Sequence, residues 1–130
     1  MKTINIILSV FVVFTSCPAW AGTITAIPPG PWTPPHTWDL HRVPHDNDIV
    51  IIPSARTVLL KNTPYAKKTN TRPVLQINIY GILDFSDNGS DKLYLNEGSK
   101  IQIYLGGEII TSSGSTEVIA IYNGVADNTL

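Results

Sequence analysis

The feature that most constrains the fold of this chain is the alternation of residues in the run from Val74 to Phe85. One side of an extended chain here carries Ile77, Ile79, Gly81, Leu83 and Phe85, and the other carries Asn78, Tyr80, Ile82 and Asp84. A period of two is typical of a β-strand with one buried face. Since no helical period of useful length appears elsewhere, we expect an all-β protein.

Further short runs have the same character. They are rich in Ile, Val, Leu and Tyr and are separated by Gly, Asn, Asp, Ser and Pro, which is typical of strands joined by turns. These runs are Ile49–Ile52, Thr57–Leu60, Leu93–Leu95, Ile101–Leu105, Glu108–Ile110 and Val118–Tyr122.

The runs also resemble one another, since Leu75–Phe85 is echoed by Ile101–Ile110. If Ile51, Ile77, Leu95 and Ile119 are equivalent inward positions, their irregular spacing is within the range of a solenoid coil. We therefore predict a short parallel β-helix, in which each coil buries its apolar side by stacking on its neighbours. A β-sandwich is the alternative, because it has strands of similar length and spacing.

The chain begins with a segment typical of a secretory signal peptide, residues 1–21. It has a positive end at Lys2, an apolar run from Ile4 to Phe14 that is too short to span a bilayer, and a small-x-small pattern ending at Ala21. We expect cleavage after Ala21 and a secreted, cell-surface or periplasmic location, without a transmembrane span. Lipid attachment at Cys17 is the alternative.

Two regions are expected after the leader. Residues 22–44 are rich in proline, which excludes a helix or a central strand, and we interpret them as an extended lead-in and cap. Residues 45–130 form the β domain. Cys17 is the only cysteine, so no disulfide is expected, and the formal net charge of −1 gives no overall basic footprint for nucleic-acid binding.

Several motifs, in their order along the chain, resemble the G8 domain, an extracellular all-β module. They are Val43-Pro44-x3-Asp48-Ile49-Val50-Ile51-Ile52-Pro53, Thr57-Val58-Leu59-Leu60, Ile77-x-Ile79-x-Gly81-x-Leu83-x-Phe85 and Ile101-x-Ile103-x2-Gly106-Gly107-x-Ile109, with Trp38 before them. The resemblance spans roughly residues 32–114. It implies a secreted or surface location, a parallel β-helix-like stack and binding of an extracellular ligand or polysaccharide, with no catalytic residues. The chain departs from the pattern because no glycine lies between Gly30 and Gly81.

Aromatic residues are the first candidates for ligand binding. Trp32 and Trp38, flanked by prolines, are candidates for a flat platform against sugar rings, because aromatic side chains bring a large contact area. The tyrosines that would extend it are Tyr65, Tyr80, Tyr94 and Tyr104. The alternative is that both tryptophans close one end of the stack.

A cationic stretch is the second candidate. Lys61, Lys67, Lys68 and Arg72 are not interrupted by any acidic residue, so the stretch is suited to an anionic polysaccharide. The alternative is an ordinary solvated loop.

Metal binding has weaker support. His36, His41 and His45 have the ligand chemistry for zinc, but their spacing suits a helix that the neighbouring prolines disfavour. Asp46 and Asp48 carry oxygen ligands for calcium, yet the structural interpretation is that Asp48 accepts backbone N–H bonds at the turn before the first strand.

Acid–base catalysis requires converging carboxylates or an oriented base, and the sequence has no such cluster. We therefore expect a non-enzymatic module without a cofactor that binds carbohydrate or another extracellular ligand, such as a surface protein in adhesion. The alternatives are a structural or capping segment of a larger adhesin and a remnant of a polysaccharide-acting enzyme.

Overall fold

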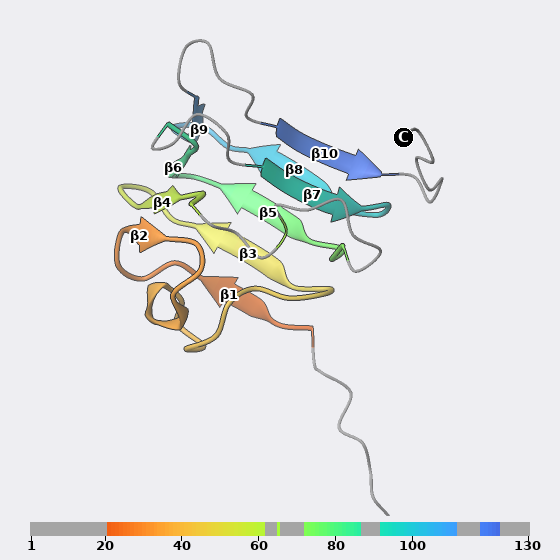
Figure 1. The fold of residues 1–130 in the computed structure, drawn as a ribbon. Coiled ribbons are helices and arrows are strands. Elements are labelled where there is room, and N and C mark those ends of the chain that lie inside the picture. The colour runs from red at the N-terminus through yellow and green to blue at the C-terminus, as the bar shows by residue number, and fades with distance from the viewer. Residues whose placement is uncertain (1–20, 62–64, 66–71, 87–91, 112–117, 123–130) are drawn as a thin grey trace, which may run out of the picture.

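The computed structural model describes residues 21–61, 65, 72–86, 92–111 and 118–122. Within these ranges every regular element is a β-strand, apart from a short 3-10 helix, η1 (Pro35–Thr37). The strands form parallel sheets that wrap around one core as a solenoid of about three turns (Figure 1). The predicted all-β parallel β-helix is therefore confirmed.

Three sheets make up the sides of the solenoid. The first contains β1 (Thr23–Thr25), β3 (Ile49–Ile52), β5 (Gln76–Ile79) and β8 (Lys100–Ile103), in that order. The second contains β2 (Gly30–Pro31), β4 (Thr57–Leu59), β6 (Ile82–Asp84) and β9 (Glu108–Ile110), and the third pairs β7 (Lys92–Asn96) with β10 (Val118–Tyr122). All these pairs are parallel, which excludes the antiparallel sheets of a β-sandwich.

Apolar residues of successive coils lie directly above one another in the core. The column in the first sheet is Ile24, Val50, Ile77 and Ile101, and the column in the second sheet includes Val58, Leu83 and Ile109. All but Ile101 and Ile109, which belong to the last coil, are fully buried. The alternation predicted for Ile77–Phe85 is confirmed, because its inward positions are buried and Tyr80 is exposed.

The predicted set of equivalent inward positions is wrong in its details. Ile51 pairs with Asn78 and is half-buried, whereas its neighbour Val50 pairs with Ile77. Leu95 and Ile119 lie in the third sheet, where Leu95 pairs with Ile121. The physical reason is that corners differ in length, so the spacing between equivalent residues changes from coil to coil.

The segment expected to be a lead-in, residues 22–44, supplies the first coil. Its strands β1 and β2 are short and lie at the edges of their sheets, which is where proline is tolerated (Figure 1). A short 3-10 helix starts at Pro35, and an isolated antiparallel bridge joins Ala26 to Trp38. The segment is thus both a cap, as expected, and part of the stack.

The corner between β5 and β6 depends on Gly81. A Cβ atom at Gly81 would lie 2.2 Å from the carbonyl oxygen of Pro53 and 2.3 Å from that of Arg56. Both oxygens belong to the coil below, so the tight turn is possible only without a side chain. Gly107 occupies the equivalent position one coil later, where a Cβ atom would lie 2.1 Å from the carbonyl oxygen of Ile79.

Several apolar side chains are exposed on the last coil. Ile103 on β8 and Ile121 on β10 are 55% and 47% exposed, and Leu105 at the following corner is fully exposed. Among the described residues, no helix has the length and apolar character needed to cross a membrane. The predicted signal peptide, except for Ala21, and the candidate lipid-attachment residue Cys17 lie outside the described residues.

Candidate functional site

The two candidate tryptophans pack against each other at the first coil. Both are fully buried, with ring centroids 5.1 Å apart and an edge-to-face angle of 73°. The indole N–H of Trp38 donates a 2.8 Å hydrogen bond to the carbonyl oxygen of Trp32. Neither ring presents a face to a ligand, so the predicted platform is wrong and the end-cap alternative describes the pair.

The three histidines do not form a metal site. His36 lies in the 3-10 helix and is exposed, His41 is in a turn with φ of 50°, and His45 faces Asp48. Among the described residues, which include all three, no group of His, Cys, Asp or Glu side chains has a metal-binding arrangement. The four-residue spacing would bring the imidazoles to one face only on a continuous α-helix, whereas the 3-10 helix here ends at Thr37, before His41 and His45.

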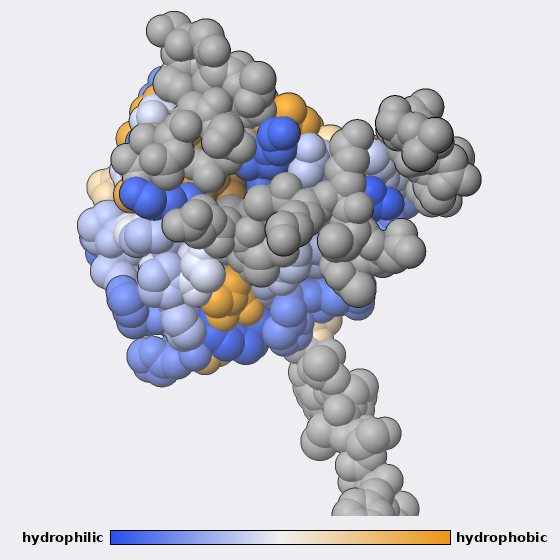
Figure 2. All heavy atoms as spheres, viewed as in Figure 1, coloured by the Kyte–Doolittle hydropathy of each residue, from blue (hydrophilic) through white to orange (hydrophobic). Residues whose placement is uncertain are grey.

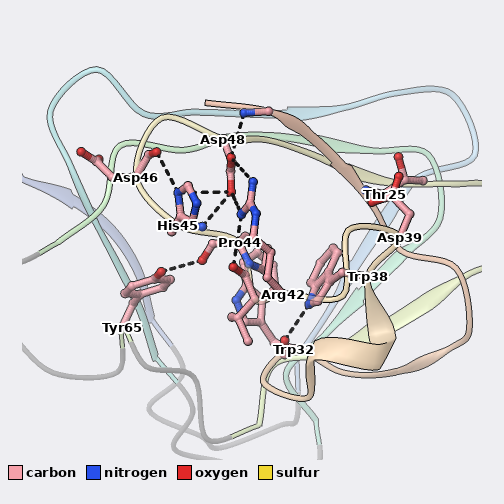
Figure 3. A network of polar contacts seen from close by, with 12 residues as sticks. Thr25, Trp32, Trp38, Asp39, Arg42, Pro44, His45, Asp46, Asp48 and Tyr65 are labelled. Atoms are coloured by element: carbon pink, nitrogen blue, oxygen red, sulfur yellow. Dashed lines mark hydrogen bonds and ion pairs between the residues drawn. The ribbon is translucent and has the colours of Figure 1, made fainter. Parts of the chain in front are cut away.

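The most elaborate polar site is centred on Asp48, which directly precedes β3 and has a side chain with no exposed surface (Figure 3). Its carboxylate accepts both guanidinium nitrogens of Arg42, with Nη2 2.9 Å from Oδ1. It also accepts the backbone N–H of His45 at 2.8 Å and that of Gly22 at 3.0 Å. The predicted structural role of Asp48 is confirmed, whereas its pairing with Arg42 was not predicted.

Burial and hydrogen bonding act in opposite directions on this carboxyl group. Burial raises its pKa, but the hydrogen bonds from Arg42, His45 and Gly22 outweigh that effect, and the pKa of Asp48 is lowered. The hydrogen bond to Asp48 likewise raises the pKa of Arg42. The carboxylate form of Asp48 is therefore stabilised, and its contacts with Gly22 and Arg42 hold the first coil to the second.

Neighbouring groups extend this network along the edge of the solenoid (Figure 3). Asp46 accepts the backbone N–H of Val74 at 2.7 Å, and the Tyr65 hydroxyl donates to the carbonyl oxygen of Pro44 at 2.6 Å. Burial raises the pKa of Tyr65. These contacts join three successive coils and so stabilise the stack.

The cationic stretch is only partly within the described residues. Lys67 and Lys68 lie outside them. The guanidinium carbon of Arg72 lies 3.9 Å from the ring centroid of Tyr122, which is a cation–π contact. The carbonyl oxygen of Lys61 accepts the hydroxyl of Thr33 at 3.2 Å. The structure therefore gives Arg72 a partner within the chain, and the role predicted for the cationic stretch stays a prediction.

A different surface has the features expected of a binding site. Tyr80 and Tyr104, at equivalent corners after β5 and β8, stack nearly parallel, with centroids 4.3 Å apart and an angle of 10°. Each is 37% exposed, in contrast to Tyr94, which is buried. Desolvation, and then the hydroxyl of Tyr104, raise the pKa of Tyr80.

Polar side chains continue this surface along the same strands. The outward residues pair in register as Gln76 with Lys100 and Asn78 with Gln102, and the Tyr104 hydroxyl lies 3.4 Å from Gln102 Oε1. We call this surface the β5–β8 patch; it consists of Gln76, Asn78, Tyr80, Lys100, Gln102 and Tyr104. Two sequence features indicate this surface. One is the set of outward-facing positions in the strand alternation, and the other is the Ile-Tyr pair that occurs both at Ile79-Tyr80 and at Ile103-Tyr104.

Comparisons of this chain with protein-family models, with curated proteins and with solved structures gave no match.

Proposed function

We propose that this chain is a non-catalytic module displayed outside the cell, related to the G8 domain, that binds a glycan on the β5–β8 patch. The observation that carries the proposal is the exposed, nearly parallel stack of Tyr80 and Tyr104. An aromatic ring with one face toward solvent is suited to the apolar face of a sugar ring. The signal-peptide pattern supports the location.

The patch also has the hydrogen-bonding groups that a sugar requires. The amides of Asn78 and Gln102 lie side by side on adjacent strands and provide both donors and acceptors. Lys100 is the only charged member, so a neutral or acidic glycan fits better than a basic ligand. On the face shown in Figure 2, hydrophobic residues occur in small groups among hydrophilic ones.

A glycan array, followed by titration of the glycans that bind, tests this proposal. We expect Tyr104→Ala to weaken binding about tenfold, equivalent to about 1.4 kcal/mol, and Tyr104→Phe to retain most of it. Leu40→Ala, which removes an exposed apolar side chain from the first coil, is the control and should bind like the wild type. Stacking should persist at 1 M salt, where the Debye length is about 3 Å.

Three results would overturn the proposal. The first is an array without any bound glycan, and the second is a bound glycan for which Tyr104→Ala has unchanged affinity. The third is release of new reducing ends from the bound glycan, since a non-catalytic module leaves its ligand intact.

A second candidate function is a structural unit in a larger assembly. The observation that favours it is the exposed apolar group Ile103, Leu105 and Ile121 on the last coil. If this coil joins copies of the chain, sedimentation velocity should show self-association that Leu105→Asp abolishes. A monomer at all concentrations would contradict this candidate.

A further inference from the structure

We propose that the carboxylate of Asp48 is the receiving site for the α-ammonium group that cleavage after Ala21 creates on Gly22. The inference rests on the proposed export of the chain, because that proposal supplies the cleavage. The new N-terminus would then have a defined position in the fold, next to Asp48.

The first support is geometric. The backbone nitrogen of Gly22 lies 3.0 Å from Oδ1 of Asp48, and the carbonyl oxygen of Gly22 accepts the N–H of Ile49 at 2.9 Å. Hydrogen bonds thus fix both the N–H and the carbonyl group of Gly22, directly before β1. Ala21 is exposed, so the bond between Ala21 and Gly22 lies at the border between solvent and the network.

The second support is the charge of the surroundings. Asp48 faces Arg42 and His45, Asp39 is close enough to raise the pKa of Arg42, and Asp46 is close enough to raise the pKa of Tyr65. Besides His45, these side chains comprise three carboxylates and one guanidinium. The carboxylates outnumber the guanidinium, so they attract a second cation. Arg42 repels that cation, because its Nη2 lies close to Gly22: a Cβ atom at Gly22 would be 3.4 Å from it.

The chemistry requires only water and a peptidase that hydrolyses the peptide bond. Hydrolysis leaves a carboxylate on Ala21 and an amine on Gly22, and an α-amine with an ordinary pKa of about 7.7–8.0 binds a proton at neutral pH. The amide N–H that donates to Asp48 is thereby replaced by an ammonium group at the same position. The acceptor is a carboxylate in both cases, so a hydrogen bond from a neutral donor becomes a hydrogen bond between two ionised groups, which adds the attraction of opposite charges.

The test compares two processed chains that differ by one residue at the N-terminus. The full chain is exported from a bacterial host with its own leader, once as the wild type and once with one glycine inserted between Ala21 and Gly22, so that both products begin with glycine. Mass spectrometry identifies the first residue of each product. The pKa of the α-amine is then measured from the pH dependence of its acylation.

We expect the wild-type product to begin at Gly22 and its α-amine to have a pKa about one unit above that of the glycine-extended product. This shift corresponds to about tenfold slower acylation below both pKa values. In urea the two amines should react alike. In Asp48→Asn, provided that circular dichroism shows it folded, the difference should disappear.

Three results would overturn the inference: a product that begins at another residue, equal pKa values for the two amines in the folded state, or a shift that persists in folded Asp48→Asn. If Asp48→Asn does not fold, the comparison of the wild-type product with the extended product still decides. None of these measurements depends on the β5–β8 patch, so a failure of glycan binding is distinguishable from a failure of this inference.

Discussion

At the scale of single residues, Trp32 and Trp38 share one contact but differ in their indole N–H groups. The N–H of Trp38 donates to the carbonyl oxygen of Trp32, whereas the N–H of Trp32 is buried and has no hydrogen-bond partner among the described residues. A buried donor without a partner costs about 1–3 kcal/mol, and a hydrogen bond contributes about 1 kcal/mol. The two tryptophans should therefore respond differently to the same substitution.

We predict that Trp38→Phe lowers the free energy of unfolding by at least about 1 kcal/mol more than Trp32→Phe does. Both changes remove similar volume, but only Trp38→Phe removes a hydrogen bond, while Trp32→Phe removes an unpaired donor. Urea denaturation of the two variants measures the difference. Equal losses, or a larger loss for Trp32→Phe, would contradict this account of the cap.

The ionisation of Asp48 should make the free energy of unfolding depend on pH. Since its pKa is lowered in the folded state, its contribution to stability is complete above the unfolded-state pKa of about 3.9 and is lost as the pH falls through the lower folded-state pKa. We expect Asp48→Asn to lower the free energy of unfolding by about 2–3 kcal/mol at pH 7, because it loses hydrogen bonds made to a charge.

Urea denaturation between pH 7 and pH 2.5 checks this prediction. The gap between wild type and Asp48→Asn should stay constant above about pH 5 and narrow below about pH 4. A gap that is unchanged down to pH 2.5 would show that the ionisation of Asp48 does not matter for stability.

At the scale of elements, the corner between β5 and β6 determines how closely two coils stack. We predict that Gly81→Ala lowers the free energy of unfolding by about 1–3 kcal/mol, because its Cβ atom would overlap the carbonyl oxygens of Pro53 and Arg56. Ser54→Ala, an exposed substitution at the adjacent corner of the coil below, is the control and should change it by less than about 0.5 kcal/mol. Equal melting temperatures for wild type and Gly81→Ala would contradict the stacking.

The strand alternation was sufficient to predict the fold class but insufficient to predict the register. A period of two shows which residues of Ile77–Phe85 face inward, yet a shift of two residues preserves that pattern. The echo of Leu75–Phe85 in Ile101–Ile110 matches Leu83 with Ile109 correctly, whereas Ile77 pairs with Ile101 and not with Ile103. The longer corner before Gly107 accounts for this shift.

Other features had no periodic signal in the sequence. The strands β1 and β2 are too short, and too close to prolines, to be recognised as the first coil. The pairing of Arg42 with Asp48 depends on turns at His41 and Asn47, two residues with positive φ. The sequence leaves the Trp pair open between a ligand platform and an end cap, because burial depends on the long-range packing of the first coil.

At the scale of the whole molecule, each coil is stabilised mainly by its two neighbours, as in other solenoids. A substitution in the middle of the stack should therefore cost more than one at its last coil. We predict that Ile77→Ala, a fully buried position, lowers the free energy of unfolding by about 2–5 kcal/mol. Ile103→Ala, more than half exposed, should lower it by less than about 1 kcal/mol. Similar losses for both, by urea denaturation, would contradict the stacking order.

The β5–β8 patch exists because the stacked coils align its side chains in register. Its proposed function is to bind a glycan. The most direct test is a titration of the 15N-labelled protein with a glycan that binds it, followed by amide chemical shifts in NMR spectra. We predict that the perturbed amides cluster in β5, β8 and the corners at Tyr80 and Tyr104. Perturbations confined to β2, β4 or β9, on a different side of the solenoid, would contradict the account.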